Sequence, residues 1–73
     1  MARIDVVSEI AGKVWKISAE PGTELEEDDD VLILESMKME IPVPAPAAGK
    51  LVELLVREGD DVAEGQAVAV IEG

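Results

Sequence analysis

Short apolar segments recur along the whole chain, and their pattern predicts β-strands. Apolar and polar residues alternate through residues 13–19, and residues 31–34 form a continuous apolar run. Abundant β-branched residues and a two-residue alternation favour strands over helices. No segment of the sequence has the 3.6-residue period of an amphipathic helix. The pattern therefore predicts an all-β protein.

The hydrophobic pattern repeats after 37 residues without a gap. The tripeptide at residues 11–13, Ala-Gly-Lys, recurs at residues 48–50. Further identities have the same spacing: Ile4 with Ile41, Val6 with Val43, Gly22 with Gly59, Glu27 with Glu64, Val31 with Val68 and Glu35 with Glu72. Self-similarity at a fixed spacing indicates two copies of one structural unit. We therefore expect a single domain over residues 1–73, with half-repeats at about residues 4–36 and 41–73 that share one core.

Each half-repeat is expected to form four short strands. In the first half these are residues 4–7, 13–19, a short piece around Leu25, and residues 30–35. In the second half they are residues 39–43, 50–56, a short piece around Val62, and residues 67–72. The junction between the two units then falls at residues 35–40.

Alternation along these strands predicts which side chains face the core. In the second strand of each half, every other residue is apolar, and we expect these alternate side chains to point inward. They are Trp15, Ile17, Ala19, Val52, Leu54 and Val56. Trp15, the only aromatic residue, is therefore expected to be at least partly buried. In the fourth strands, Glu35 and Glu72 share one parity, and a carboxylate is rarely buried without a partner. We expect the opposite parity to point inward, namely Leu32, Leu34, Ala69 and Ile71.

Glycine and proline residues mark the predicted turns and edges. Gly22 and Gly59 follow the second strands, where a tight turn often requires a positive φ. Gly65 marks another turn, and its counterpart in the first half is Asp28, a residue type that tolerates left-handed geometry better than most. The prolines that follow the junction lack N–H donors and confine their segment to a sheet edge or a loop. These prolines are Pro42, Pro44 and Pro46.

The junction itself contains the candidate chemistry. An apolar strand before it and an extended piece after it, joined by a few polar residues, predict a hairpin. Lys38 falls at the tip of this hairpin, so its amine is expected to point into water. Met37 and Met39 flank the lysine, and exposed methionines are not needed to fold a hairpin. This arrangement favours a recognition role for the tip.

Composition removes several classes of function. The chain has no cysteine and no histidine, which excludes disulfides, thiolate metal sites and Ser-His or Cys-His catalysis. With 17 acidic and 6 basic residues the net charge is −11, so nucleic-acid binding is not expected. No apolar run approaches a membrane span and no signal sequence is evident, so no membrane partner and a cytoplasmic location are expected. The acidic run at residues 24–30 is interpreted as a solvated loop, with partner docking as the alternative.

The hexapeptide Glu35-Ser36-Met37-Lys38-Met39-Glu40 resembles the biotin attachment motif of biotin carboxyl carrier domains, which centres on Met-Lys-Met. The resemblance covers essentially the whole chain, because both halves of the sequence are similar to the framework of that family. The matching framework positions are Gly22, Leu25, Leu32 and Leu34 in the first half, and residues 48–50, 58–60, Val62 and residues 65–66 in the second. The short length looks most like the stand-alone biotin/lipoyl attachment proteins.

This resemblance implies a flattened β-barrel of two four-stranded antiparallel sheets with pseudo-twofold symmetry. It implies that a biotin protein ligase forms biotinyl-adenylate and that the Lys38 amine attacks it to form an amide. Biotin on Lys38 is then implied to carry a carboxyl group between a biotin carboxylase and a carboxyltransferase of an acyl-CoA or related carboxylase. Met37 and Met39 are implied flanking recognition residues, with Glu35, Ser36 and Glu40 as further motif positions. The chain itself is expected to be a non-catalytic carrier, monomeric when isolated.

Two other interpretations remain open at this point. The lipoyl branch of the family typically has Asp-Lys-Ala at the tip, so Met-Lys-Met favours biotin, with lipoate on the same lysine as the alternative. The other alternative is an unmodified interaction domain of the same fold, in which Lys38 is an ordinary surface lysine. One departure from the family pattern is Asp28, which stands where a glycine is usual, and it leaves the local loop geometry to be tested.

Overall fold

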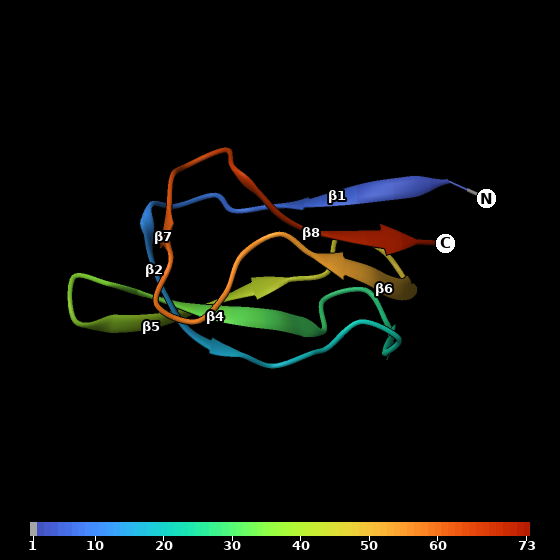
Figure 1. Cartoon of the computed structure of the whole chain (residues 1–73), viewed down its shortest axis with the longest axis horizontal. Helices are drawn as coiled ribbons and strands as arrows, with labels where there is room; N and C mark the ends of the chain where they lie inside the picture. Colours follow the sequence, from blue (N-terminus) through green and yellow to red (C-terminus); the bar gives the residue numbers. More distant parts are fainter. Residues whose placement is uncertain (1) are drawn as a thin grey trace.

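The computed structural model describes residues 2–73, which form eight β-strands and no helix (Figure 1). In chain order the strands are β1 (Arg3–Val7), β2 (Gly12–Ile17), β3 (Glu24–Leu25), β4 (Asp30–Ser36), β5 (Met39–Pro44), β6 (Gly49–Leu54), β7 (Asp61–Val62) and β8 (Ala67–Glu72). All the strands predicted from the sequence are present, and their ends differ from the prediction by two residues or fewer. Over the same residues, no helix is long and apolar enough to cross a membrane.

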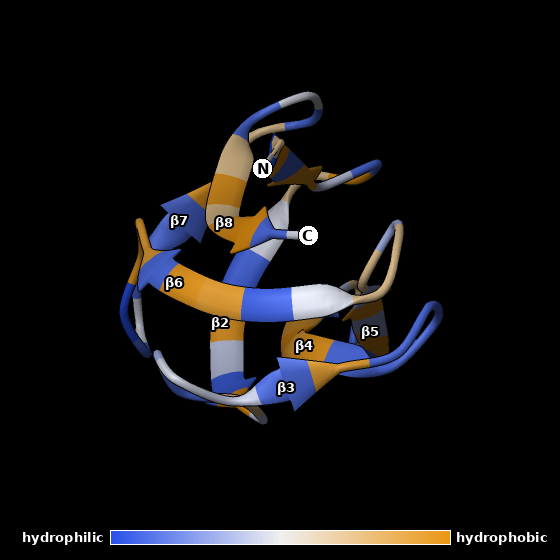
Figure 2. Cartoon of the chain, turned by 90° about the vertical axis from the view of Figure 1, so that its right-hand side faces the viewer, coloured by the Kyte–Doolittle hydropathy of each residue, from blue (hydrophilic) through white to orange (hydrophobic). Residues whose placement is uncertain are grey.

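The eight strands form two four-stranded antiparallel sheets. Their strand orders are β1-β8-β6-β3 and β5-β4-β2-β7. Replacing each strand of the first sheet by the strand 37 residues away reproduces the order of the second sheet. Figure 2 shows how apolar and polar bands alternate along the strands. The predicted all-β architecture of two pseudo-symmetric sheets is therefore confirmed.

Each half-repeat hydrogen-bonds to the other through its turns. The backbone N–H of Gly22 donates to the carbonyl of Leu51 (2.7 Å), and the N–H of Gly59 donates to the carbonyl of Val14 (2.8 Å). Both glycines have a positive φ, as predicted. Because both of these bonds join one half to the other, the two turns help to hold the halves together.

The turns at Asp28 and Gly65 have the same geometry despite their different residue types. Their φ values are 74° and 83°. The N–H of Asp28 donates to the backbone carbonyl of Ala45 (2.9 Å), and the N–H of Gly65 donates to the backbone carbonyl of Ser8 (2.8 Å). The aspartate therefore adopts the left-handed conformation in place of glycine, and the turn is preserved.

The core lies between the two sheets and consists of aliphatic side chains. Leu32, Leu34, Ala69 and Ile71 are fully buried, as predicted. The expectation that the alternate residues of these strands face outward is wrong at Val31 and Val68, which belong to the buried core. The strand register skips Val31 in β4 and Val68 in β8, so irregularities at these two positions break the alternation. Val70 is buried as well, but it pairs with the exposed residues Asp5 and Glu53 on the neighbouring strands and is not part of the core cluster.

The predicted orientation of Trp15 is also wrong. A β-bulge between Val14 and Lys16 reverses the alternation at the start of β2. Val14 is buried there, whereas Trp15 is 47% exposed on the outside of the sheet. An equivalent bulge in β6 separates Leu51 from Glu53, and Leu51 takes the core position. After the bulge the prediction holds, since Ala19 and Val56 are buried and Ile17 and Leu54 pack against the core.

The β4–β5 hairpin and the chain ends lie at opposite ends of an elongated body (Figure 1). The body measures 36 × 19 × 18 Å along its principal axes. At the end opposite the hairpin, the N–H of Gly73 donates to the carbonyl of Ala2 (3.1 Å). Under the internal symmetry, the hairpin tip therefore corresponds to the gap between the two chain ends.

Candidate functional site

The β4–β5 hairpin ends in a two-residue turn formed by Met37 and Lys38. Ser36 and Met39 are the last register pair before this turn. Met37 and Lys38 both have a positive φ, 52° and 64°. Two left-handed residues in a two-residue hairpin turn define type I′, whose twist matches that of the strands it joins. Lys38 thus lies at the tip, as the sequence predicts.

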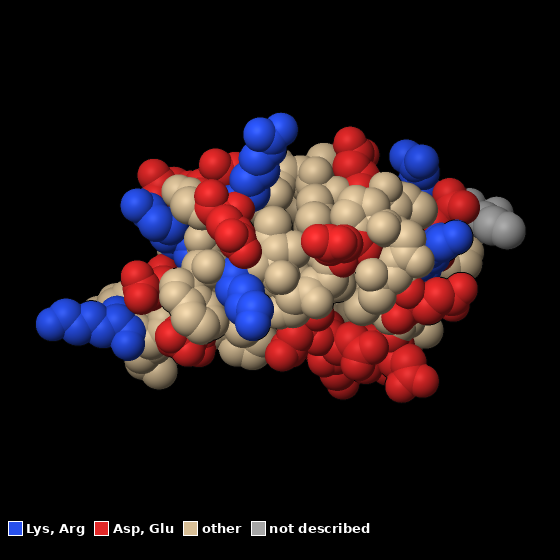
Figure 3. Space-filling view, turned by 60° about the horizontal axis from the view of Figure 1, so that its bottom comes forward, with Lys and Arg blue, Asp and Glu red and all other residues tan. Residues whose placement is uncertain are grey.

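The side chains of this turn project into solvent. Met37 is 92% exposed and Met39 is 62% exposed, and Lys38 is exposed between them. The only ion pair among residues 2–73 joins Arg3 to Glu72 (3.6 Å), so no carboxylate of the described chain holds the Lys38 amine. At the hairpin end, on the left in Figure 3, a basic side chain extends beyond the body. The arrangement presents a primary amine that another molecule can reach from several sides.

The base of the hairpin pairs two glutamates. Glu35 on β4 lies directly opposite Glu40 on β5, and both side chains are exposed. At the other end of the body, the equivalent pair is Glu72 and Arg3, which form the ion pair. Like charges directly opposite each other destabilise a sheet, whereas opposite charges stabilise it. The fold therefore does not require the glutamate pair at the hairpin.

A glycine on β2 lies close to the base of this hairpin. A Cβ atom placed on Gly12 falls 2.8 Å from the carbonyl oxygen of Glu35 and 3.4 Å from the Cβ of Ser36. The six predicted motif residues occupy consecutive register positions and the turn, so the structure brings all of them together. They are Glu35, Ser36, Met37, Lys38, Met39 and Glu40. Gly12 did not emerge from the sequence as a site residue, although its identity with Gly49 in the repeat was a signal.

The acidic run comprises β3, the β3–β4 connection and the first residue of β4, away from the hairpin. Its carboxylates are exposed, and Figure 3 shows acidic side chains gathered toward the end opposite the hairpin. The carboxylate of Asp29 accepts a hydrogen bond from the N–H of Glu26 (2.9 Å). In the other half, the side-chain amide oxygen of Gln66 accepts a hydrogen bond from the N–H of Ala63 (3.0 Å). At least part of this run therefore stabilises a turn.

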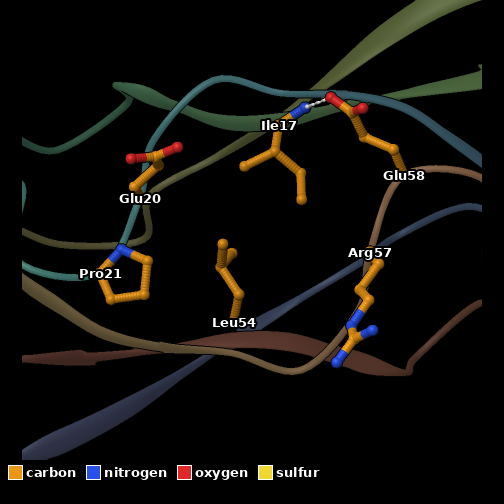
Figure 4. A pocket seen from close by; sticks show the side chains of 6 residues that line it. All are labelled: Ile17, Glu20, Pro21, Leu54, Arg57 and Glu58. Carbon is orange, nitrogen blue, oxygen red and sulfur yellow. Dashed lines mark hydrogen bonds between the residues drawn. The ribbon is translucent and has the colours of Figure 1, made fainter.

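A hollow lined by residues of both halves lies apart from the hairpin (Figure 4). Its lining consists of three repeat-related pairs, Ile17 with Leu54, Glu20 with Arg57 and Pro21 with Glu58. Ile17 and Leu54 point toward its middle, while Glu20 and Arg57 lie at opposite corners. The carboxylate of Glu58 accepts a hydrogen bond from the N–H of Ile17 (3.4 Å). In residues 2–73 no three acidic side chains are grouped to hold a metal ion.

Comparison with known proteins identifies the family. The Biotin_lipoyl family model, described as biotin-requiring enzyme, matches residues 3–71. The chain belongs to this family. The biotin/lipoyl domain is 46% identical over 57 residues to the biotin/lipoyl attachment protein of Bacillus subtilis, covering 78% of each chain. It is 40% identical over 67 residues to the biotinylated protein TB7.3 homolog of Mycobacterium leprae, covering 92% of this chain and 94% of that one.

The structure of this biotin/lipoyl domain also matches a solved carboxylase. It superposes on part of the Kluyveromyces lactis urea carboxylase with a TM-score of 0.93 and 39% identity. The match covers 99% of this chain but 6% of the urea carboxylase chain. The same domain thus occurs both in short chains and as a small part of a much longer one.

Proposed function

We propose that this biotin/lipoyl domain is a biotin carboxyl carrier and that biotin is attached to the Nζ atom of Lys38. The observation that carries the proposal is the tip of the β4–β5 hairpin, where the lysine stands exposed on a two-residue turn with no carboxylate of residues 2–73 bound to it. An amide bond to a carboxylic acid needs such an accessible primary amine. The description of the family as biotin-requiring enzyme and the similarity to a biotinylated protein support biotin as the acid.

The attachment step uses the lysine as nucleophile. The Nζ lone pair attacks the carboxyl carbon of biotin that a ligase has activated as its adenylate. AMP leaves with the electrons of the broken C–O bond, a proton leaves the nitrogen, and an amide forms. The ligase activates the acid as its adenylate, because a free carboxylate has no leaving group that an amine can displace.

The residues around Lys38 suit a carrier. When attached, biotin carries a carboxyl group between a biotin carboxylase site and a carboxyltransferase site. The turn fixes the backbone at Lys38, and the four-carbon side chain supplies the freedom to reach two different active sites. Met37 and Met39, both exposed, have flexible and polarizable side chains that adapt to more than one partner surface.

The remaining parts of the proposal concern enzymes and assembly. The chain acts as a non-catalytic component of a biotin-dependent carboxylase, and its partners are biotin protein ligase, biotin carboxylase and carboxyltransferase. Support comes from the urea carboxylase match, in which a longer carboxylase chain contains this fold. We further propose that the domain is monomeric when isolated and that it works in the cytoplasm.

Mass spectrometry of the intact protein tests the attachment. The domain is incubated with a biotin protein ligase, ATP and biotin, and in parallel with a lipoate ligase, ATP and lipoate. We expect a gain of one biotinyl group on the wild type and none on Lys38→Arg, which keeps the charge but lacks a primary amine. A wild type that gains only lipoate identifies a lipoyl carrier. A wild type that gains neither group identifies an unmodified interaction domain, and biotin retained on Lys38→Arg shows that another residue is the site.

A further inference from the structure

The close approach of β2 to the base of the hairpin has a consequence for the modified lysine. A methyl group on Gly12 would lie 2.8 Å from the Glu35 carbonyl oxygen and 3.4 Å from the Ser36 Cβ. A contact under 3.0 Å to a backbone atom forces a displacement, because backbone atoms cannot rotate away as a side chain does. The atoms that this methyl group would press against belong to the last two residues of β4 before the turn.

A displacement of the end of β4 is transmitted to Lys38. Ser36 and Met39 form the last register pair, and the turn beyond them has only two residues, both in the left-handed region. Such a turn has no spare length to absorb a shift. Gly12 therefore sets the place of the tip relative to the body of the domain.

The internal symmetry shows that this close approach is a property of the fold at both ends. A Cβ atom on Gly49 falls 2.8 Å from the carbonyl oxygen of Glu72, the position equivalent to Glu35, and 2.5 Å from the Cγ2 atom of Ile71. The clash at Gly49 is thus at least as severe as the clash at Gly12. Only Gly12, however, supports a strand that leads directly into a reactive turn, since β8 leads to Gly73 at the opposite end.

We propose that Gly12 is a positioning residue for the modification of Lys38, and that the ligase requires the lysine at a set distance from the body of the domain. This inference rests on the proposed biotin attachment. An enzyme that recognised the tip alone would follow the hairpin wherever it moved. An enzyme that contacts both the tip and the body loses alignment when the hairpin is displaced, and a shift of about 1 Å can cost about 100-fold in rate.

The test compares Gly12→Ala with Gly49→Ala, which is the matched control. Circular dichroism and thermal melts first establish that both variants are folded. The kcat/KM of biotinylation is then measured with biotin protein ligase, ATP and biotin. We expect Gly12→Ala to lower kcat/KM by at least about 10-fold relative to Gly49→Ala. A second measurement uses a biotin succinimidyl ester, with modification of Lys38 quantified by peptide mapping, and we expect equal rates for all three proteins because this reagent needs no alignment.

Three results would overturn the proposal. In the first, the two variants have equal kcat/KM values. In the second, the succinimidyl ester rate at Lys38 falls in parallel with the ligase rate, which shows that the amine itself has changed. If a variant is unfolded in buffer, all proteins are compared in trimethylamine N-oxide, which favours the folded state. In the third result, the Gly12→Ala protein stays unfolded even in trimethylamine N-oxide, which shows that Gly12 is required for folding and not specifically for positioning Lys38. A wild type that is not biotinylated contradicts the proposed function instead, and so is distinguishable.

Discussion

The glutamate pair at the base of the hairpin should lower the stability of the domain, and Glu40→Arg should raise it. The comparison is unusually well matched. Glu35 lies between Lys13 and Glu40 in its sheet, and Glu72 lies between Lys50 and Arg3 in the other. Among these cross-strand neighbours the charge differs at one position, which is Glu40 beside Glu35 and Arg3 beside Glu72. Of the two pairs, only Arg3 and Glu72 form an ion pair.

The expected effect follows from the energies of cross-strand pairs. A favourable opposite-charge pair contributes roughly 0.2–1 kcal/mol, and a like-charge pair directly opposite is destabilising. Both positions are exposed, where water and salt weaken such interactions, and Lys13 already offsets part of the repulsion. We expect a gain of about 0.5–1 kcal/mol in the free energy of unfolding. For a domain of this size that corresponds to a rise of about 2–8 °C in Tm.

Thermal melts of four variants at low and high salt measure the effect. Arg3→Glu creates the like-charge pair at the other end and should lower Tm by a similar amount. Glu40→Gln removes the repulsion without adding an ion pair and should give a smaller rise. Glu64→Arg changes the net charge from −11 to −9, as Glu40→Arg does, but at an exposed turn position outside the paired strands.

The outcome at high salt decides whether the reasoning is correct. At 1 M salt the Debye length is about 3 Å, so the advantage of Glu40→Arg over Glu64→Arg should shrink. An advantage that persists unchanged at 1 M salt would show a packing effect of the arginine. Equal Tm values for Glu40→Arg and Glu64→Arg at low salt would show that the glutamates do not repel each other measurably.

Three further predictions concern single features of the domain. Lys38→Ala should abolish biotinylation and change the free energy of unfolding by less than about 0.5 kcal/mol, because the side chain is exposed; intact mass and urea melts check both parts. The double variant Met37→Asp with Met39→Ala should lose a few-fold to about 100-fold in biotinylation, or roughly 1–3 kcal/mol, and gain in lipoylation; unchanged rates with both ligases would place recognition in the body of the domain. Trp15→Ala should cost less than Leu34→Ala, for which about 2–5 kcal/mol is expected, because Trp15 is 47% exposed and Leu34 is fully buried; equal losses in urea melts would contradict this.

The sequence by itself determined the architecture and the tip of the hairpin. The 37-residue repeat, the alternation and the turn residues together indicated eight strands in two related units, and those strands are present. Local chemistry is sufficient for such features. A two-residue period describes a strand whatever it packs against, and two apolar segments joined by a short polar piece form a hairpin with its middle residue at the tip.

Only the tertiary structure decided the direction of Trp15 and the close contacts of Gly12. The bulge after Val14 follows from the pairing of β2 with β4, and one extra residue in a strand reverses the side on which every preceding residue lies. The lack of room for a side chain on Gly12 beside Glu35, and the pairing of Glu35 with Glu40, both depend on strand order and register. Register is a property of two strands together, so the pattern within either strand alone does not determine it.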